Sequence, residues 1–154
     1  MTLTTTLISA DLLFQAGSTL ALPGWLALAL VPAGSRWAAR ARRLAGRVLP
    51  LLLALPYVAL FVTQGMGDGG YGSLAAVQRL MGNPYLLTAG WLHYLAFDLF
   101  VGAWIAERAA AMRLPHALLL PLLALTFLFG PAGLLAFAAL RATWLARQRG
   151  LVQA

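Results

Sequence analysis

The sequence predicts an all-α polytopic membrane protein, a small bundle of four transmembrane helices forming a single membrane domain over residues 1–154. The first observation is composition: 62% of the 154 residues are hydrophobic and 10% are charged. Soluble globular domains average about 45–50% apolar and about 25% charged residues. The second is pattern, because four apolar stretches, each long enough to cross about 30 Å of hydrocarbon, alternate with segments rich in Arg, Pro or Gly. A chain of this length leaves no room for a second folded unit.

The charge pattern fits a membrane protein and excludes several other classes. All eleven basic residues are Arg, and the net charge is +7. Arg beside a membrane span is retained on the cytoplasmic side and meets anionic head groups of the bilayer. The segments between spans lack the polar or aromatic readers of a nucleic-acid surface, so no nucleic-acid partner is expected. With no Cys and only two His, the chain predicts no metal site and no cofactor.

The first predicted span covers residues 7–31 and carries polar side chains along one side of a helix. Pro23 predicts a kink, which membrane helices tolerate where neighbouring helices satisfy the freed carbonyl. Residues 32–47 form a basic loop with five Arg. Their spacing suits a short amphipathic helix lying in the head-group region.

The second and third spans are predicted at residues 48–66 and 85–107. The third has a clear start, with Asn83 as the N-cap and Pro84 at the first helical position. Because adjacent spans of a hairpin bundle run antiparallel, side chains from different spans can be compared by depth, at about 1.5 Å per residue.

The fourth span is predicted at residues 115–141, interrupted part-way by Gly130-Pro131, and continues into a basic tail at residues 141–154. With four crossings, both termini lie on one side. Seven Arg then fall in the first and third loops and four on the other side. The positive-inside rule places the more basic side in the cytoplasm. The sequence therefore predicts a multi-pass protein of a cell inner membrane with its termini on the non-cytoplasmic side.

Two ionisable residues, His93 and Asp98, lie inside the third span. An Asp at the bilayer centre costs about 2.5–3.5 kcal/mol or more, so the pair marks a candidate site. Depth counting places polar side chains of other spans at the same two levels. The residues predicted to share these levels are Gln15 and Gln64 with His93, and Tyr57 and Thr126 with Asp98.

The helical spacing separates the two ionisable residues by angle. Five residues correspond to about 140° around a helix, so Asp98 shares a stripe with Trp91 and Tyr94, and His93 lies on the opposite side with Phe97. Either the third span is central and both faces are enclosed, or one of the two residues faces a second chain. Each also has a structural alternative, a hydrogen bond to a neighbouring helix, beside its functional one as a proton donor or acceptor.

The small residues in the third span are compatible with a homo-oligomer. Gly102 and Ala106 form a small-xxx-small pair, which permits close helix contact within the chain or between chains. The aromatic residues of the same span line a pocket for a flat apolar ligand or pack between helices.

Two segments resemble the signature of a known family. They are residues 90–102, GWLHYLAFDLFVG, and residues 125–135, LTFLFGPAGLL, followed by Arg141; residues 22–25, LPGW, are a weaker match. They resemble the abscisic-acid-deficiency-four-like membrane proteins over roughly residues 7–141. The absence of Lys favours a bacterial member.

The resemblance implies a chemistry. Plant members of that family are plastid membrane proteins required to form neoxanthin from violaxanthin, a reaction that opens a carotenoid epoxide and produces an allene. The resemblance implies His93 and Asp98 as the polar centre, with Thr126 and the Gly130-Pro131 break beside them. No Arg-rich transit segment precedes the first span, so a different carotenoid, an apocarotenoid or a terpenoid is the expected substrate.

These observations lead to a neoxanthin-synthase-like isomerase or epoxide-opening enzyme of carotenoid biosynthesis. It acts on an apolar isoprenoid drawn from the lipid bilayer and uses buried Asp98 as acid and His93 as base. The alternative is a non-catalytic carotenoid-binding, lipid-binding or scaffold protein. A transporter ranks third, because no span carries a continuous polar path. The predicted substrate-binding residues are Gln15, Tyr57, Gln64, Trp91, Tyr94, Phe97, Thr126 and Phe129.

Overall fold

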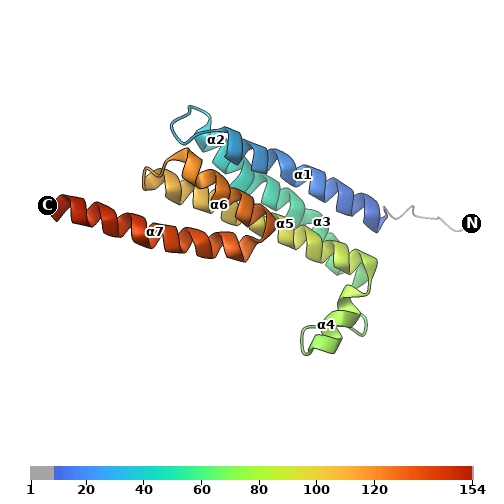
Figure 1. Cartoon of the computed structure of the whole chain (residues 1–154). Helices are drawn as coiled ribbons and strands as arrows, with labels where there is room; N and C mark the ends of the chain where they lie inside the picture. Colours follow the sequence, from blue (N-terminus) through green and yellow to red (C-terminus); the bar gives the residue numbers. More distant parts are fainter. Residues whose placement is uncertain (1–8, 154) are drawn as a thin grey trace, which may run out of the picture.

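The computed structural model describes residues 9–153 of the chain, and their side chains as far as Ala146. Every regular element in that range is a helix (Figure 1). In chain order they are α1 (Ala10–Leu30), α2 (Ala38–Arg43), the π-helical turn η1 (Leu44–Val48), α3 (Leu49–Gln64), α4 (Leu74–Met81), α5 (Pro84–Ala111), α6 (His116–Leu128) and α7 (Gly130–Gln153).

Three helical segments are long and apolar enough to cross a membrane. They are α1, the continuous run Ala38–Gln64 that ends in α3, and α5, and they correspond to the first three predicted spans. Helix α6 has 13 residues, or about 20 Å at 1.5 Å per residue, which is too short for about 30 Å of hydrocarbon. The structure therefore supports a helical membrane protein with three candidate crossings.

The predicted fourth span is instead a hairpin of two helices. Helix α6 ends before Phe129, whose φ of −147° and ψ of 68° are not helical, and α7 packs back along α6 (Figure 1). Pro131 cannot continue a helix, because it lacks an N–H and its ring clashes with the carbonyl four residues earlier. Gly133 completes the turn, since a Cβ there would lie 2.5 Å from the backbone nitrogen of Thr126. A fourth crossing over residues 115–141, with a break at Gly130-Pro131, is therefore not confirmed.

The hairpin changes where the ends of the chain lie. Helix α7 returns toward the end of the bundle from which α6 came, so α1 begins and α7 finishes at opposite ends (Figure 1). The Trp144 Nε1 donates to the Met112 carbonyl at 3.3 Å, which places this part of α7 level with the end of α5. The prediction that both termini lie on one side required four crossings and is not supported.

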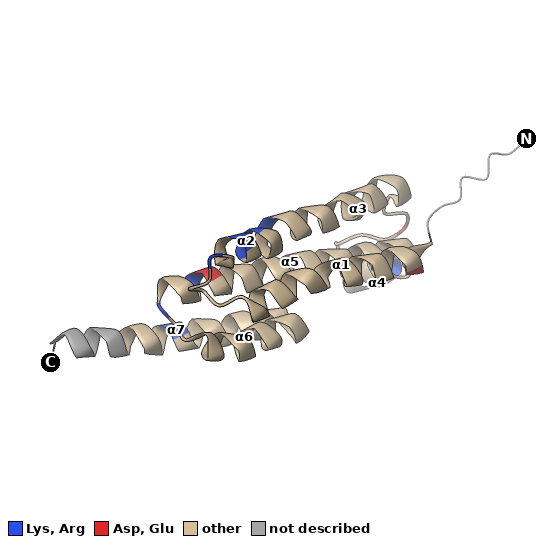
Figure 2. Cartoon of the chain, turned by 90° about the horizontal axis from the view of Figure 1, so that it is seen from above, with Lys and Arg blue, Asp and Glu red and all other residues tan. Residues whose placement is uncertain are grey.

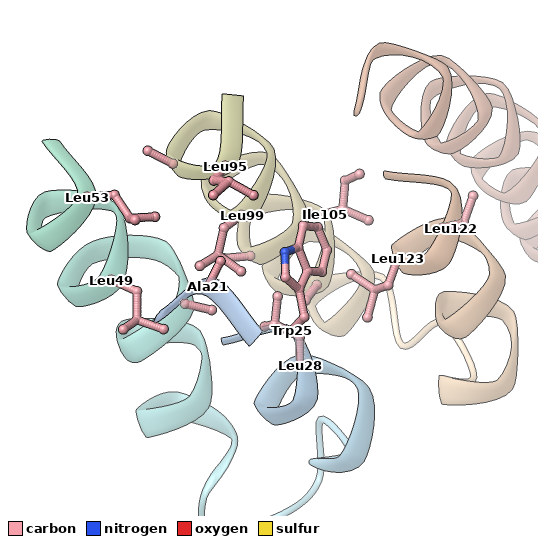
Figure 3. Close-up of a cluster of buried hydrophobic side chains, with 14 of the residues drawn as sticks. Ala21, Trp25, Leu28, Leu49, Leu53, Leu95, Leu99, Ile105, Leu122 and Leu123 are labelled. Carbon is pink, nitrogen blue, oxygen red and sulfur yellow. The ribbon is translucent and has the colours of Figure 1, made fainter. Parts of the chain in front are cut away.

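Helix α5 is the centre of the bundle and contacts α1, α3 and α6. Its contacts depend on close approach: a Cβ on Gly24 of α1 would lie 2.8 Å from both Leu49 and Leu99, and one on Gly102 would lie 2.6 Å from the ring of Trp25. Small residues allow such packing, which stabilises helix association inside a bilayer. The cluster around these contacts contains Ala21, Trp25, Leu28, Leu49, Leu53, Leu95, Leu99, Ile105, Leu122 and Leu123 (Figure 3).

The small-xxx-small pair of α5 is thus used inside the chain. Gly102 faces Trp25, and Ala106 is 6% exposed. This pair is not available to a second chain, and a homo-oligomer would have to use another surface.

Candidate functional site

The apex of the hairpin lies against Asp98, near the middle of α5. The side chain is 9% exposed, and a Cβ on Gly130 would lie 2.6 Å from its carboxyl carbon. Only glycine lets the backbone come so close to the carboxyl. The Gly130 N–H and the Tyr94 hydroxyl both lie beside the carboxyl, and its Oδ2 is buried with no hydrogen-bond partner among the described residues. The structure therefore encloses an acid and leaves one of its oxygens unsatisfied.

Tyr94 connects this acid to the hairpin and to an aromatic row. It lies one helical turn before Asp98, and its hydroxyl donates to the Leu128 carbonyl at 3.1 Å. Its ring stacks on Trp91 with 5.3 Å between ring centroids, and Trp91 stacks on Phe14 at 5.1 Å. Aromatic stacking of this kind holds the three rings in fixed positions. The row leads from α1 to the apex of the hairpin.

The aromatic row forms one wall of an apolar groove of about 540 Å³ between α1 and α5. The hairpin reaches only as far as Tyr94 and Asp98, so the first turns of α1 and α5 remain uncovered on this side. The groove has the size of a small-molecule site, and Tyr94 lies at its inner end. Its lining residues are Ala10, Asp11, Phe14, Pro84, Leu87, Thr88, Gly90, Trp91 and Tyr94.

His93 lies on a different face of α5. Its side chain is exposed at the outside of the bundle, and its ring stacks on Phe97 at 4.5 Å and approaches Tyr57 at 5.6 Å between centroids. This arrangement confirms the angular separation of His93 and Asp98 expected from helical spacing. Of the predicted site residues, the structure brings Asp98, Tyr94 and Trp91 together and groups His93 with Tyr57 and Phe97.

The remaining predicted site residues serve other parts of the structure. Thr126 is fully buried, and its hydroxyl donates to the Leu122 carbonyl within α6 at 2.7 Å. Phe129, at the apex, is 62% exposed. Gln15 is exposed on α1, and Gln64, the last residue of α3, lines a separate cavity with the Gly-rich loop after it.

Sequence reasoning missed one partner of the site, Phe14. Gly130 was expected beside Asp98, but only through the family resemblance. Phe14 and Ser18 lie four residues apart on α1, and Ser18 accepts a 2.9 Å hydrogen bond from Trp91 Nε1. A search for aromatic and hydroxyl residues on one face of the first span would have found both of these residues.

The described residues contain no group of three or more His, Cys, Asp and Glu able to hold a metal ion. A family model described as ABA4-like, ABA DEFICIENT 4-like, matches residues 12–137, a range that includes the groove wall, Asp98 and the hairpin apex. The chain belongs to the ABA4-like family. The predicted resemblance is thereby confirmed, and membership identifies the chain as a membrane protein of a family linked to carotenoid and neoxanthin metabolism. Comparison with curated proteins and with solved structures finds no match.

Proposed function

We propose that this ABA4-like protein is an isomerase or epoxide-opening enzyme acting on a carotenoid-like isoprenoid. The observation that supports this best is Asp98, a buried carboxyl with an unpartnered oxygen, which lies one helical turn beyond Tyr94, the residue at the inner end of an apolar groove. The groove would hold one end of the isoprenoid, with the remainder of its chain lying in the bilayer. A carboxylate without a counterion is costly at this depth, so the resting acid is taken as neutral.

The proposed reaction needs a proton at the start and releases one at the end. Neutral Asp98 gives its proton to the epoxide oxygen through the Tyr94 hydroxyl, and the carbon–oxygen bond opens. The carboxylate then regains a proton, again through the Tyr94 hydroxyl, from the carbon beside the cation, so that substrate and product are isomers. The Gly130 N–H stabilises the transient carboxylate. Because one carboxyl performs both transfers, the reaction does not require His93, which faces away from the groove.

The direct test is turnover of an epoxy-carotenoid by the purified protein in detergent, followed by chromatography and mass measurement of the product. Asp98→Asn should lower the rate by about 10²- to 10⁴-fold, the range typical of a lost proton-transfer group. Glu107→Gln is the matched control, since it neutralises an exposed acid on the same helix. Conversion by folded Asp98→Asn at the wild-type rate would contradict the proposal.

A non-catalytic carotenoid-binding protein is the second candidate, and the stacked row of Phe14, Trp91 and Tyr94 favours it. Such a row can contact the flat face of a polyene and bind it without any proton transfer. An extract of the purified protein distinguishes the two candidates. Retained, chemically unchanged pigment with no turnover of any epoxy-carotenoid supports binding alone.

We also propose an orientation in a bacterial inner membrane. Apart from Arg79 of α4, which lies at the opposite end, the Arg residues with described side chains gather at the end of the bundle where α2 lies (Figure 2). The positive-inside rule then places the α2 end in the cytoplasm and the start of α1 on the other side. Because the chain has no Cys, single substitutions Gly34→Cys and Ser73→Cys can report the orientation in intact cells. A membrane-impermeant thiol reagent should label Cys at position 73 only, and labelling of position 34 instead would reverse the orientation.

A further inference from the structure

Another cavity, of about 300 Å³, lies at the α2 end of the bundle and is separate from the groove between α1 and α5. One side comes from α2 and η1, and the other from the last turns of α5. Three Arg and one Glu line it, together with small and aromatic residues. The lining residues are Ala39, Arg42, Arg43, Gly46, Arg47, Phe100, Ala103, Trp104 and Glu107.

The backbone adopts an unusual conformation where the Arg residues line this cavity. Residues Leu44–Val48 form a π-helical turn, a rare conformation that is frequent at functional sites. Gly46 lies in this turn, and a Cβ there would be 2.9 Å from the Cβ of Ala103. The turn therefore packs directly on α5, and Arg43, just before the turn, and Arg47, within it, line the cavity.

The cavity carries excess positive charge, because Arg42, Arg43 and Arg47 face a single acid, Glu107. The nearby Arg36 and Arg40 belong to a different arrangement. Their guanidinium groups lie 5.3 and 4.7 Å from the centre of the Trp37 ring, in cation–π contacts outside the cavity.

The opposite wall, formed by α5, is apolar apart from Glu107 and continues toward the hydrocarbon. Phe100 is half exposed and lies nearer the middle of α5 than Trp104. A ligand that fills this cavity would meet guanidinium groups at the membrane surface and aromatic rings below them. Arg recognises phosphate through paired hydrogen bonds, and basic pockets of this kind at the cytoplasmic side bind lipid head groups.

We propose that this cavity binds a phosphate group, carried by an anionic membrane amphiphile whose apolar chain follows Phe100 and Trp104. The site is independent of carotenoid conversion, since it lies at the far end of α5 from the groove. Its occupant would hold the basic α2–η1 segment against α5.

Native mass spectrometry of the whole protein in detergent tests the proposal with phosphatidylglycerol, phosphatidylcholine and inorganic diphosphate as probes. Phosphatidylglycerol should bind in preference to phosphatidylcholine. The double substitution Arg43→Gln and Arg47→Gln should weaken its binding by about tenfold or more, because hydrogen bonds to a charged group are lost. If diphosphate fails to displace phosphatidylglycerol, the apolar chain of the lipid contributes to binding, as proposed. If diphosphate alone binds with the same affinity as phosphatidylglycerol, the ligand of this site is a free phosphate and the membrane amphiphile is ruled out.

The matched control is the double substitution Arg36→Gln and Arg40→Gln, which removes the same charge from the same surface outside the cavity. Equal loss of lipid binding in both double variants would overturn the proposal, because it would show general attraction to a basic surface. Glu107→Gln keeps every Arg and should strengthen phosphatidylglycerol binding several-fold. This variant tests the site even if the Arg double variant fails to fold, and unchanged or weaker binding would contradict the proposal.

Discussion

The two ionisable residues in the middle of α5 lie on different faces of the helix, and only one of them is buried. On one face, the α6–α7 hairpin covers Asp98 and brings the Gly130 backbone against its carboxyl. On the other, His93 is exposed beside the rings of Phe97 and Tyr57. Enclosing an acid in a membrane protein is costly, and here a tight turn encloses it one helical turn beyond the groove residue Tyr94. The difference shows that two costly residues in one span need not form one site.

The largest expected effect comes from the close approach that defines the Asp98 face. Gly130→Ala places a Cβ where the carboxyl lies, so the hairpin apex must shift. We expect destabilisation of about 1–3 kcal/mol, as for overpacked cores, measured by thermal unfolding in detergent, together with loss of turnover. Gly34→Ala is the matched control, because a Cβ there meets nothing within 4 Å. If the two variants unfold at the same temperature and have the same turnover, the close packing of the hairpin does not distinguish the Asp98 face from the His93 face.

Tyr94 should show the next largest effect, chiefly through function, with a stability loss of about 1 kcal/mol from its hydrogen bond to the Leu128 carbonyl. Tyr94→Phe keeps the ring on Trp91 and removes the hydroxyl that lies between the groove and Asp98. We expect turnover to fall about a hundredfold, within the range for a lost proton-transfer group, while retained pigment is unchanged. A wild-type rate in this variant would mean that Asp98 reaches the substrate without Tyr94.

Trp91→Phe should have a smaller effect, on stability. The variant retains an aromatic ring in the row and loses the hydrogen bond from Trp91 Nε1 to Ser18. A single hydrogen bond contributes about 1 kcal/mol, and thermal unfolding can detect that loss. Ser18→Ala supplies the complementary variant, and the double variant should be no less stable than the less stable single variant if the bond is the shared cause.

The smallest effect is expected on the opposite face. His93→Gln removes an exposed ring, and substitutions at exposed positions change stability by about 0.5 kcal/mol or less. Turnover and pigment retention should stay near wild type. A loss of turnover comparable to that of Asp98→Asn would restore His93 to the reaction and would require a second chain or a large rearrangement of α5.

Much of the helical architecture could be predicted from the sequence, because span length and capping are local. Asn83 accepts hydrogen bonds from the Tyr85 and Leu86 backbone nitrogens at 2.9 and 3.4 Å, as its position before Pro84 predicts. The stripe shared by Asp98, Tyr94 and Trp91 follows from helical periodicity, and the structure confirms it.

The hairpin and the neighbours of Asp98 could not be predicted in the same way. A mostly apolar stretch of twenty-seven residues with a Gly-Pro break in the middle fits a kinked span as well as two short helices. Local preferences determine where the break falls but not its angle. Depth counting likewise gives the level of Tyr57 and Thr126 but not the side of the bundle they face. Thr126 turned out to hydrogen-bond within α6, and Tyr57 to contact His93.

The central claim is that the isoprenoid binds on the Asp98 face of α5, and photo-crosslinking tests it most directly. A benzophenone amino acid replaces either Leu87, which lines the groove, or Phe97, which is exposed beside His93. After illumination with an epoxy-carotenoid, mass spectrometry measures the fraction of protein carrying the added mass. We predict crosslinking from position 87 and none above background from position 97. Crosslinking from position 97 alone would contradict the account.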